Sequence, residues 1–184
     1  MLRLFIALHF PDKIKDAIGR LISGAQGYAN GIKWIEAKNL HLTLKFLGDT
    51  QEKQVPAIIG GIQIALANAK AFEVTVEGCG GFPSLRNPRV IWTGISDGDQ
   101  ISQLAQSINH ELSGIGIEKD KKKFSPHITL GRVKKPGDMS GLMSYLDNLN
   151  FTLEPVILNR IALVKSTLTS RGPIYENVEN FKLF

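Results

Sequence analysis

Two short segments of the chain each carry a histidine followed two positions later by a threonine. They read His41-Leu42-Thr43-Leu44 and His127-Ile128-Thr129-Leu130, and their histidines lie 86 residues apart. We predict both segments to be strands, since polar and apolar residues alternate in them. Side chains two positions apart in a strand point to one face, about 6.6 Å from each other. Each segment therefore offers an imidazole and a hydroxyl to one ligand, at a spacing that suits a phosphate.

Two histidines on either side of a phosphorus atom supply both proton transfers of an in-line displacement. One takes a proton from the attacking water, and the other gives a proton to the departing oxygen. The ordinary pKa of a histidine, ~6.5, makes both forms available near neutral pH. The hydroxyls of Thr43 and Thr129 can donate to the non-bridging oxygens. Neither transfer needs a metal, so we expect no metal and no cofactor.

Three further residues near the second segment are candidates for contacts with an anionic substrate. Arg132 follows Thr129 by three residues and could stabilise charge in the transition state. Its odd spacing would place it on the other strand face unless Gly131 allows a twist or bulge. Lys123 and Phe124 could guide an RNA backbone and stack on a base. For these two, a solvated lysine run and core packing are the alternative interpretations.

The remaining elements follow from two hydrophobic periods, 3.6 for helices and 2 for strands. In the first half we predict a strand over residues 2–8, a helix whose apolar residues run from Ile14 to Ile22, and the strand 41–47. A helix over 55–66 and a strand over 72–77 follow, and the glycines of 78–81 predict a turn. The second half predicts strand 89–95, helix 101–112, an extended piece 116–118, strand 126–133, helix 142–146 and strand 151–156. Two more strands, 160–168 and 174–178, end the chain.

The two halves repeat the same order of elements at a nearly constant offset. Shifting the first helix and the helix near residue 51 by 86 positions lands on the matching helices of the second half, which suggests an internal duplication. We therefore predict an α+β fold that is bilobal, with a duplicated β-α-β-β-α-β motif. Antiparallel sheets would surround a central cleft, with helices outside. Residues 1–184 would form one domain, with pseudo-repeats of about 1–80 and 88–157 and added strands over 159–180.

The composition favours an anionic partner without naming one. The formal net charge is +5 and the isoelectric point is near 9.4, with a lysine-rich run at 119–123. Cys79 is the single cysteine, which excludes an internal disulfide and argues against a cysteine-based zinc site. With no signal pattern and no apolar run near ~18 residues, we expect a cytoplasmic monomer that does not enter a membrane. His9 and His110 have no matching partner, so we expect structural or solvent-facing roles for both.

The paired segments and their surroundings resemble a known family. The chain is similar to the RNA 2′,3′-cyclic phosphodiesterases, or 2′-5′ RNA ligase-like proteins, of the two-histidine phosphoesterase superfamily. Besides the two motifs, the resemblance rests on Arg3-Leu4-Phe5-Ile6-Ala7, Phe46-Leu47-Gly48, Gly81-Phe82-Pro83, Ser125-Pro126 and the segment from Ser166 to Tyr175. The motifs match the family pattern without a substitution.

The resemblance implies hydrolysis of a terminal 2′,3′-cyclic phosphate of RNA to a 2′-phosphomonoester. By motif position, His41 would be the proton donor to the leaving 3′ oxygen and His127 the proton acceptor from water. Microscopic reversibility would let the same groups ligate 2′-5′ ends. Two alternatives remain open at this point. One is a phosphodiesterase of a small cyclic phosphate, and the other is a module that binds RNA ends without reacting.

Overall fold

The computed structural model describes residues 1–135, 137–170 and 172–184, so residue 171 of the segment from Ser166 to Tyr175 lies outside the described part. The described residues form nine strands and four α-helices. The strands are β1 (Leu2–Leu8), β2 (Ile32–Trp34), β3 (Leu42–Thr50), β4 (Phe72–Phe82), β5 (Val90–Ser96), β6 (His127–Val133), β7 (Val156–Leu158), β8 (Arg160–Thr169) and β9 (Gly172–Lys182). The helices are α1 (Asp12–Ala25), α2 (Val55–Leu66), α3 (Asp99–Gly114) and α4 (Ser140–Asn148). The predicted α+β class is confirmed.

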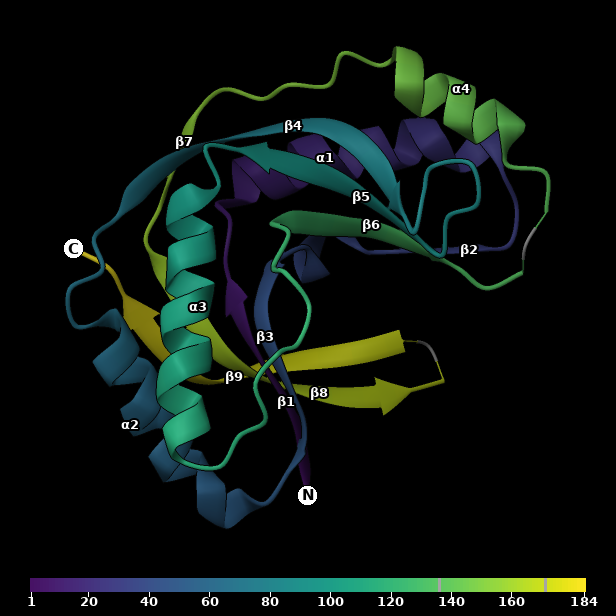
Figure 1. Ribbon diagram of the computed structural model, residues 1–184. Helices are drawn as coiled ribbons and strands as arrows, with labels where there is room; N and C mark the ends of the chain where they lie inside the picture. The colour runs from purple at the N-terminus through teal and green to yellow at the C-terminus, as the bar shows by residue number, and fades with distance from the viewer. Residues whose placement is uncertain (136, 171) are drawn as a thin grey trace.

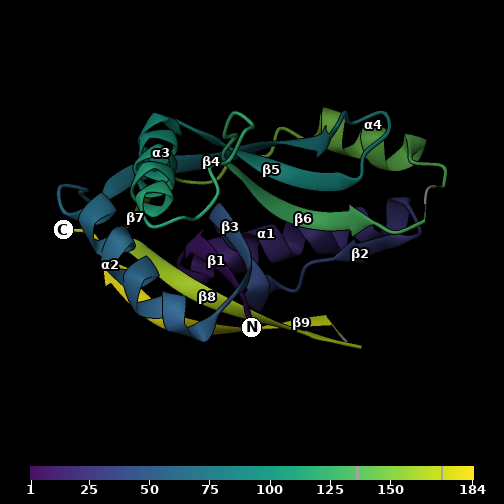
Figure 2. The same ribbon diagram turned by 60° about the horizontal axis from the view of Figure 1, so that its bottom comes forward.

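The strands join one curled antiparallel sheet with the two motif strands at its centre. Its order is β7-β4-β5-β6-β3-β1-β8-β9, and β2 pairs with β6. In both views β4, β5 and β6 form one wall, and β8 and β9 form the wall facing it (Figures 1 and 2). The halves of the chain interleave, because β4 of the first half pairs with β5 of the second, while β8 pairs with β1. Neither half of the chain therefore builds one half of the sheet alone.

The alternation of β1 separates the helix-covered core from the opposite face of the sheet. Leu4, Ile6 and Leu8 belong to the large core cluster, which also holds the buried apolar stripe of α1. Phe5 and Ala7 point the other way and pack with Ala162, Val164 and Tyr175. The strand is buried on both faces, which explains why its sequence is almost continuously apolar.

Helices α2 and α3 lie side by side against the same end of the sheet (Figures 1 and 2). Their contact is close, because a Cβ on Gly61 of α2 would lie 2.8 Å from Leu112 Cδ2 of α3. This contact fixes α3, whose C-terminal end leads into the loop before the second motif strand.

Two local predictions were wrong. Residues 78–81 are not a turn, since β4 continues through them with a bulge at Gly78, whose φ is +67°. The glycines serve packing instead, because a Cβ on Gly80 would overlap the ring of Trp92. The strand expected over 151–156 is shifted to Val156–Leu158. The extended piece expected over 116–118 belongs to no helix or strand, with a turn at Gly116.

Candidate active site

The two motif strands meet at one pair of residues. Leu42 of β3 lies directly opposite Ile128 of β6, and no other pair between these strands is present among the described residues. Extending this antiparallel register by one residue in each direction places His41 across from Thr129 and Thr43 across from His127. Each histidine therefore faces the threonine of the other motif.

Both motif strands carry a bulge at the same position of the motif. In β6, Thr129 pairs with Trp92 and Gly131 with Ile91, which leaves Leu130 as the extra residue. In β3, Thr43 pairs with Ala7 and Lys45 with Ile6, which leaves Leu44 as the extra residue. Each bulge reverses the alternation of the residues that follow it, so their side chains change face.

The bulge of β6 determines on which face of the strand Arg132 lies. Arg132 pairs with Val90, which shares a face of β5 with Trp92 and Gly94, the partners of Thr129 and His127. Arg132 therefore lies on the face of the second motif, as a bulge near Gly131 would allow. Gly131 itself is closely covered, because a Cβ there would lie 2.8 Å from Ile32 and 2.9 Å from the ring of Trp34. The equivalent position in β3 is Phe46, which is 63% exposed.

The two imidazoles are held in the same way. His41 Nδ1 lies 2.7 Å from the carbonyl oxygen of Asn39, and His127 Nδ1 lies 2.7 Å from that of Ser125. A carbonyl oxygen only accepts, so each Nδ1 carries the hydrogen and donates it. Each Nε2 is consequently the atom that can accept a proton when the ring is neutral and donate one when it is charged.

Aromatic rings contact both histidines. The ring of Phe5 lies 4.9 Å from that of His41, and Phe82 lies 5.0 Å from His127 at an interplanar angle of 81°. Tyr175 of β9 contacts His41 edge-on at 5.4 Å. These three contacts were not predicted from the sequence. Tyr175 reaches His41 only because β9 follows β8, which pairs with β1, and no local pattern signals that.

Burial sets the charge state of the histidines. Burial lowers the pKa of His41 to about 4. The hydrogen bond to the Asn39 carbonyl raises this pKa, whereas the charges of His9, Arg132 and Lys15 lower it further. Burial also lowers the pKa of His127, against the bond to Ser125, and Arg132 adds to the lowering. Both rings are therefore neutral near pH 7 without a ligand. The charge of Arg132 lowers the pKa of both histidines, which agrees with its position on the face of the second motif.

A large cavity of about 950 Å³ adjoins the pair on the side of His41. Phe5 and Tyr175 form its wall beside the histidine, and the first turn of α1 and the near ends of β8 and β9 complete it. His9 lines this cavity as well, although the sequence assigned it no part in a site. Lys123 and Phe124 line a different hollow of about 500 Å³ beside the start of α3, so the structure does not bring them together with His41. Phe124 is partly buried against the core.

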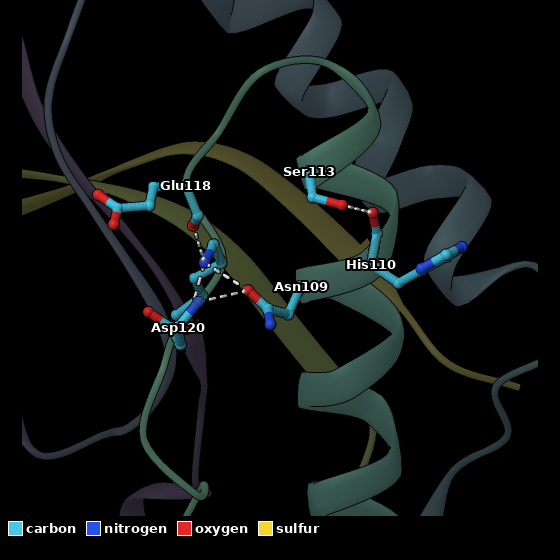
Figure 3. Close-up of polar contacts among 6 residues, drawn as sticks. Asn109, His110, Ser113, Glu118 and Asp120 are labelled. Atoms are coloured by element: carbon cyan, nitrogen blue, oxygen red, sulfur yellow. Dashed lines mark hydrogen bonds and ion pairs between the residues drawn. The ribbon is translucent and has the colours of Figure 1, made fainter.

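A buried lysine connects the first motif strand to the loop before the second. Lys45 is 2% exposed, and its Nζ donates to Asn109 Oδ1 at 2.7 Å and to the carbonyl of Glu118 at 2.9 Å. It also forms an ion pair with Asp120 at 3.2 Å. Figure 3 shows Asn109 of α3 and the Glu118–Asp120 segment converging on this point. The connection ties β3 to the segment that runs into Ser125 and His127.

Neither a metal-binding group nor a membrane span is found in the described residues. No cluster of three or more His, Cys, Asp or Glu side chains that could hold a metal ion occurs in residues 1–135, 137–170 and 172–184. In the same ranges, no helix has the length and apolar character needed to cross a membrane.

Comparison with known proteins places this geometry in a family. The model of the 2′-5′ RNA ligase superfamily matches residues 10–169. An RNA 2′,3′-cyclic phosphodiesterase of Methanothermobacter thermautotrophicus is 31% identical over 182 residues, which cover 98% of each chain. An Aquifex aeolicus protein of the same name is 38% identical over 155 residues, covering 82% of this chain and 81% of the relative.

Solved structures of other proteins share the fold of this chain. A crystal structure of a Thermus thermophilus protein superposes with a TM-score of 0.83 at 26% identity, covering 99% of this chain and 98% of the other. Escherichia coli LigT in complex with 3′-AMP superposes with a TM-score of 0.77 at 23% identity, with coverage of 99% and 98%. The family match spans most of the chain and includes both histidine motifs. The chain belongs to the 2′-5′ RNA ligase superfamily.

Proposed function

We propose that the protein hydrolyses the 2′,3′-cyclic phosphate at the end of an RNA chain to a 2′-phosphomonoester, without a metal. The observation that carries this proposal is the matched setting of the two imidazoles. Each is fixed through Nδ1 to a carbonyl two residues earlier, faces the other motif's threonine, and keeps Nε2 for proton transfer. The names of the relatives, RNA 2′,3′-cyclic phosphodiesterase, supply the substrate class.

The proposed reaction is a single in-line displacement. His127 Nε2 takes a proton from water as the water oxygen attacks phosphorus. The bond between phosphorus and the 3′ oxygen breaks on the opposite side, and His41 Nε2 gives its proton to that oxygen. The product is a 2′-phosphate next to a free 3′-hydroxyl. Proton exchange with solvent then returns His127 to its neutral form, and His41 takes up a proton again when the next cyclic phosphate binds.

Three side chains would stabilise the negative charge that builds up on the non-bridging oxygens in the transition state. Thr43 and Thr129 face the opposite histidines and can donate to the non-bridging oxygens. Arg132, on the face of Thr129, adds a positive charge where negative charge accumulates. With a 5′-hydroxyl in place of water, the same groups would open the 2′,3′-cyclic phosphate to a 2′-5′ linkage, with the 3′ oxygen leaving as a hydroxyl, and this step is reversible.

His41 can act as the proton donor only if the bound substrate raises its pKa. A ring whose pKa is about 4 is neutral in the free protein at pH 7. The negative charge of the bound cyclic phosphate must raise that pKa to keep the donor protonated. A donor is lost when it deprotonates, so we expect the basic limb of kcat, which reports the bound complex, to lie at higher pH than the basic limb of kcat/KM, which reports the free protein.

Product analysis tests the proposal directly. An oligonucleotide ending in a 2′,3′-cyclic phosphate is incubated with the protein in excess EDTA, and the position of the monoester is determined. A 2′-phosphate supports the assignment, whereas a 3′-phosphate would show that the 2′ oxygen leaves instead. His41→Gln and His127→Gln should each lower kcat by at least about 10²-fold. Binding of the oligonucleotide without product would identify a module that only binds RNA ends.

A further inference from the structure

The cavity beside His41 has a pair of like charges at its far end. Arg160 of β8 and Lys182 of β9 are directly opposite each other in the antiparallel ladder, and both line the cavity. Ala162 and Val164 continue the same face of β8 toward His41, because they pair with Ala7 and Phe5. A continuous face of the sheet therefore runs from the reacting centre to two adjacent cations.

Like charges directly opposite each other across a sheet destabilise it. Nearby acids do not relieve this pair, because no carboxylate lies within ion-pair distance of Arg160 or Lys182 in the residues that the structure describes. The ammonium of Lys182 lies 5.3 Å from the Phe184 ring, which leaves its charge in place. An anion bound between the two cations would remove the repulsion.

The other charged residues that line the cavity are also mostly positive. Lys15 and Lys38 also line the cavity, whereas Asp12 is its only acidic lining residue in the described chain. Lys15 is 3.8 Å from Asp12, and Lys38 is 2.7 Å from Glu36, so these two cations already have acidic partners. Arg160 and Lys182 are left as the strongest attraction for a ligand anion.

Neutral polar groups line the wall between the cations and His41. Asn177 and Asn180 of β9 are joined by a side-chain hydrogen bond of 2.9 Å and both face the cavity. Burial lowers the pKa of His9, and the charges of Lys15 and Arg160 lower it further, so this ring adds no charge near pH 7. Amide and imidazole groups of this kind can hydrogen-bond a ribose or a base edge.

The proposed chemistry fixes which part of a substrate reaches this cavity. In an in-line displacement the water enters beside His127, and the leaving 3′ oxygen with its ribose lies beside His41. The rest of the RNA chain is attached to that ribose. We propose that Arg160 and Lys182 bind a phosphodiester group of the RNA chain on the 5′ side of the terminal cyclic phosphate. This inference rests on the function proposed above.

The distances favour a site for a second phosphate over a second contact to the first. Leu8 pairs with Leu42 of β3 and with Ile161 of β8, so the backbone of Arg160 lies two strands across the sheet from that of His41, about 10 Å. Lys182 of β9 lies one strand further, about 14 Å from His41. A single cyclic phosphate held between the histidines cannot span that length. A cavity of about 950 Å³ is at the upper end of the range of ligand pockets, ~300–1,000 Å³, and has room for more than the terminal nucleotide.

The test compares two substrates with the same reacting end. One is a nucleoside 2′,3′-cyclic phosphate, which has no phosphodiester on its 5′ side, and the other is a tetranucleotide that ends in the same nucleoside cyclic phosphate. The variant is the double substitution Arg160→Gln with Lys182→Gln. We expect it to lower the ratio of kcat/KM on the tetranucleotide to kcat/KM on the nucleoside at least about tenfold. Equal losses on both substrates, or an unchanged ratio, would overturn the inference.

Lys165→Gln is the matched control. Lys165 lies on β8 as well, but it pairs with Leu4 on the opposite face and forms an ion pair with Glu176 at 3.1 Å. The substitution removes one positive charge from the same strand. A similar fall in the kcat/KM ratio for Lys165→Gln would mean that overall charge, and not this site, binds the RNA chain.

A binding experiment separates this inference from the proposed function. The affinity for a tetranucleotide that already carries a 2′-phosphate is measured over a range of salt concentrations. For single strands the logarithmic slope changes by about 0.7 for each phosphate contact. The double variant should have a slope flatter by about that amount, even if the protein hydrolyses neither substrate and the proposed function fails. An unchanged slope would refute the site whatever the hydrolysis shows.

Discussion

Leu42 of β3 lies directly opposite Ile128 of β6 at the centre of the sheet, and the two residues belong to the two histidine motifs. Both side chains are completely buried. Because the residues before and after them point to the other face, one buried apolar contact sets the relative position of both histidines and both threonines. This contact therefore fixes the placement of the four side chains that the proposed chemistry uses.

Arg132 should control the pH dependence of the reaction. Its charge lowers the pKa of His41 and of His127, after the larger effect of burial. Arg132→Gln removes this contribution, so the acidic limb of kcat/KM should move to higher pH. The loss of a charged donor should also lower kcat by about 10²-fold. Arg132→Lys keeps the charge and should keep the pH profile, which stopped-time assays between about pH 4 and 9 can measure.

The exposed Arg20 of α1 provides the control for that prediction, because Arg20→Gln makes the same chemical change away from the cleft. Its profile should coincide with that of the unaltered protein. If Arg132→Gln also left the limb in place, the guanidinium would not act on the histidines.

His41 should make stability depend on pH below neutrality. Its pKa is about 4 in the folded protein, and an unfolded histidine titrates near ~6.5, so the unfolded chain binds more protons between these values. The contribution is fully present above about pH 6.5 and is lost as the pH falls toward 4, by about 3 kcal/mol in all. Urea unfolding of the His41→Gln variant should show a correspondingly smaller loss of unfolding free energy between about pH 7 and pH 4.

The exposed His110 supplies the comparison for this effect. His110→Gln should lose as much stability on acidification as the unaltered protein, because the carboxylates that titrate in the same range are common to both. A loss in His41→Gln equal to that in His110→Gln would contradict the prediction.

The sequence was sufficient to identify the motif faces but not the pairing around them. The period-two alternation of residues 41–44 and 127–130 placed each histidine with its threonine, which the strands of the structure reproduce. The bulges at Leu44 and Leu130 were not predictable in position, because a bulge is a property of two paired strands. The contacts of Tyr175 and the opposition of Arg160 and Lys182 have the same origin in long-range strand order. The glycines of 78–81 were misread because the bulk of Trp92, which requires Gly80, lies elsewhere in the sequence.

Gly131 should be required for the position of the second motif. A Cβ would lie 2.8 Å from Ile32 Cγ2 and 2.9 Å from Trp34 Cε3, both in the strand that pairs with β6. Gly131→Ala must displace that strand or the motif, so we expect a loss of about 1–3 kcal/mol in unfolding free energy and a lower kcat. A methyl group on Gly60 of α2 would meet nothing within 4 Å, so Gly60→Ala should stabilise by about 0.5–1 kcal/mol. Equal effects of the two alanines would rule out the steric explanation.

The ammonium of Lys45 should contribute far more to stability than its surface counterparts. Lys45→Met fills a similar volume but leaves the Glu118 carbonyl without its donor and takes one donor from Asn109, whose Oδ1 keeps the backbone N–H of Asp120 at 3.1 Å. Unsatisfied buried acceptors cost about 1–3 kcal/mol each, so we expect a loss of about 2–4 kcal/mol in unfolding free energy. Chemical denaturation of Lys45→Met measures it.

Two control variants distinguish loss of the buried hydrogen bonds of Lys45 from simple loss of a charge. The Asp120 side chain is 52% exposed, so Asp120→Asn should cost less than about 1 kcal/mol. Lys53 is exposed, and Lys53→Met should stay within about 0.5 kcal/mol of the unaltered protein. Because the segment held by Lys45 runs into Ser125, whose carbonyl orients His127, Lys45→Met should also lower kcat under conditions where it is fully folded. A folded Lys45→Met variant with full kcat would show that the network stabilises the fold without positioning the histidine.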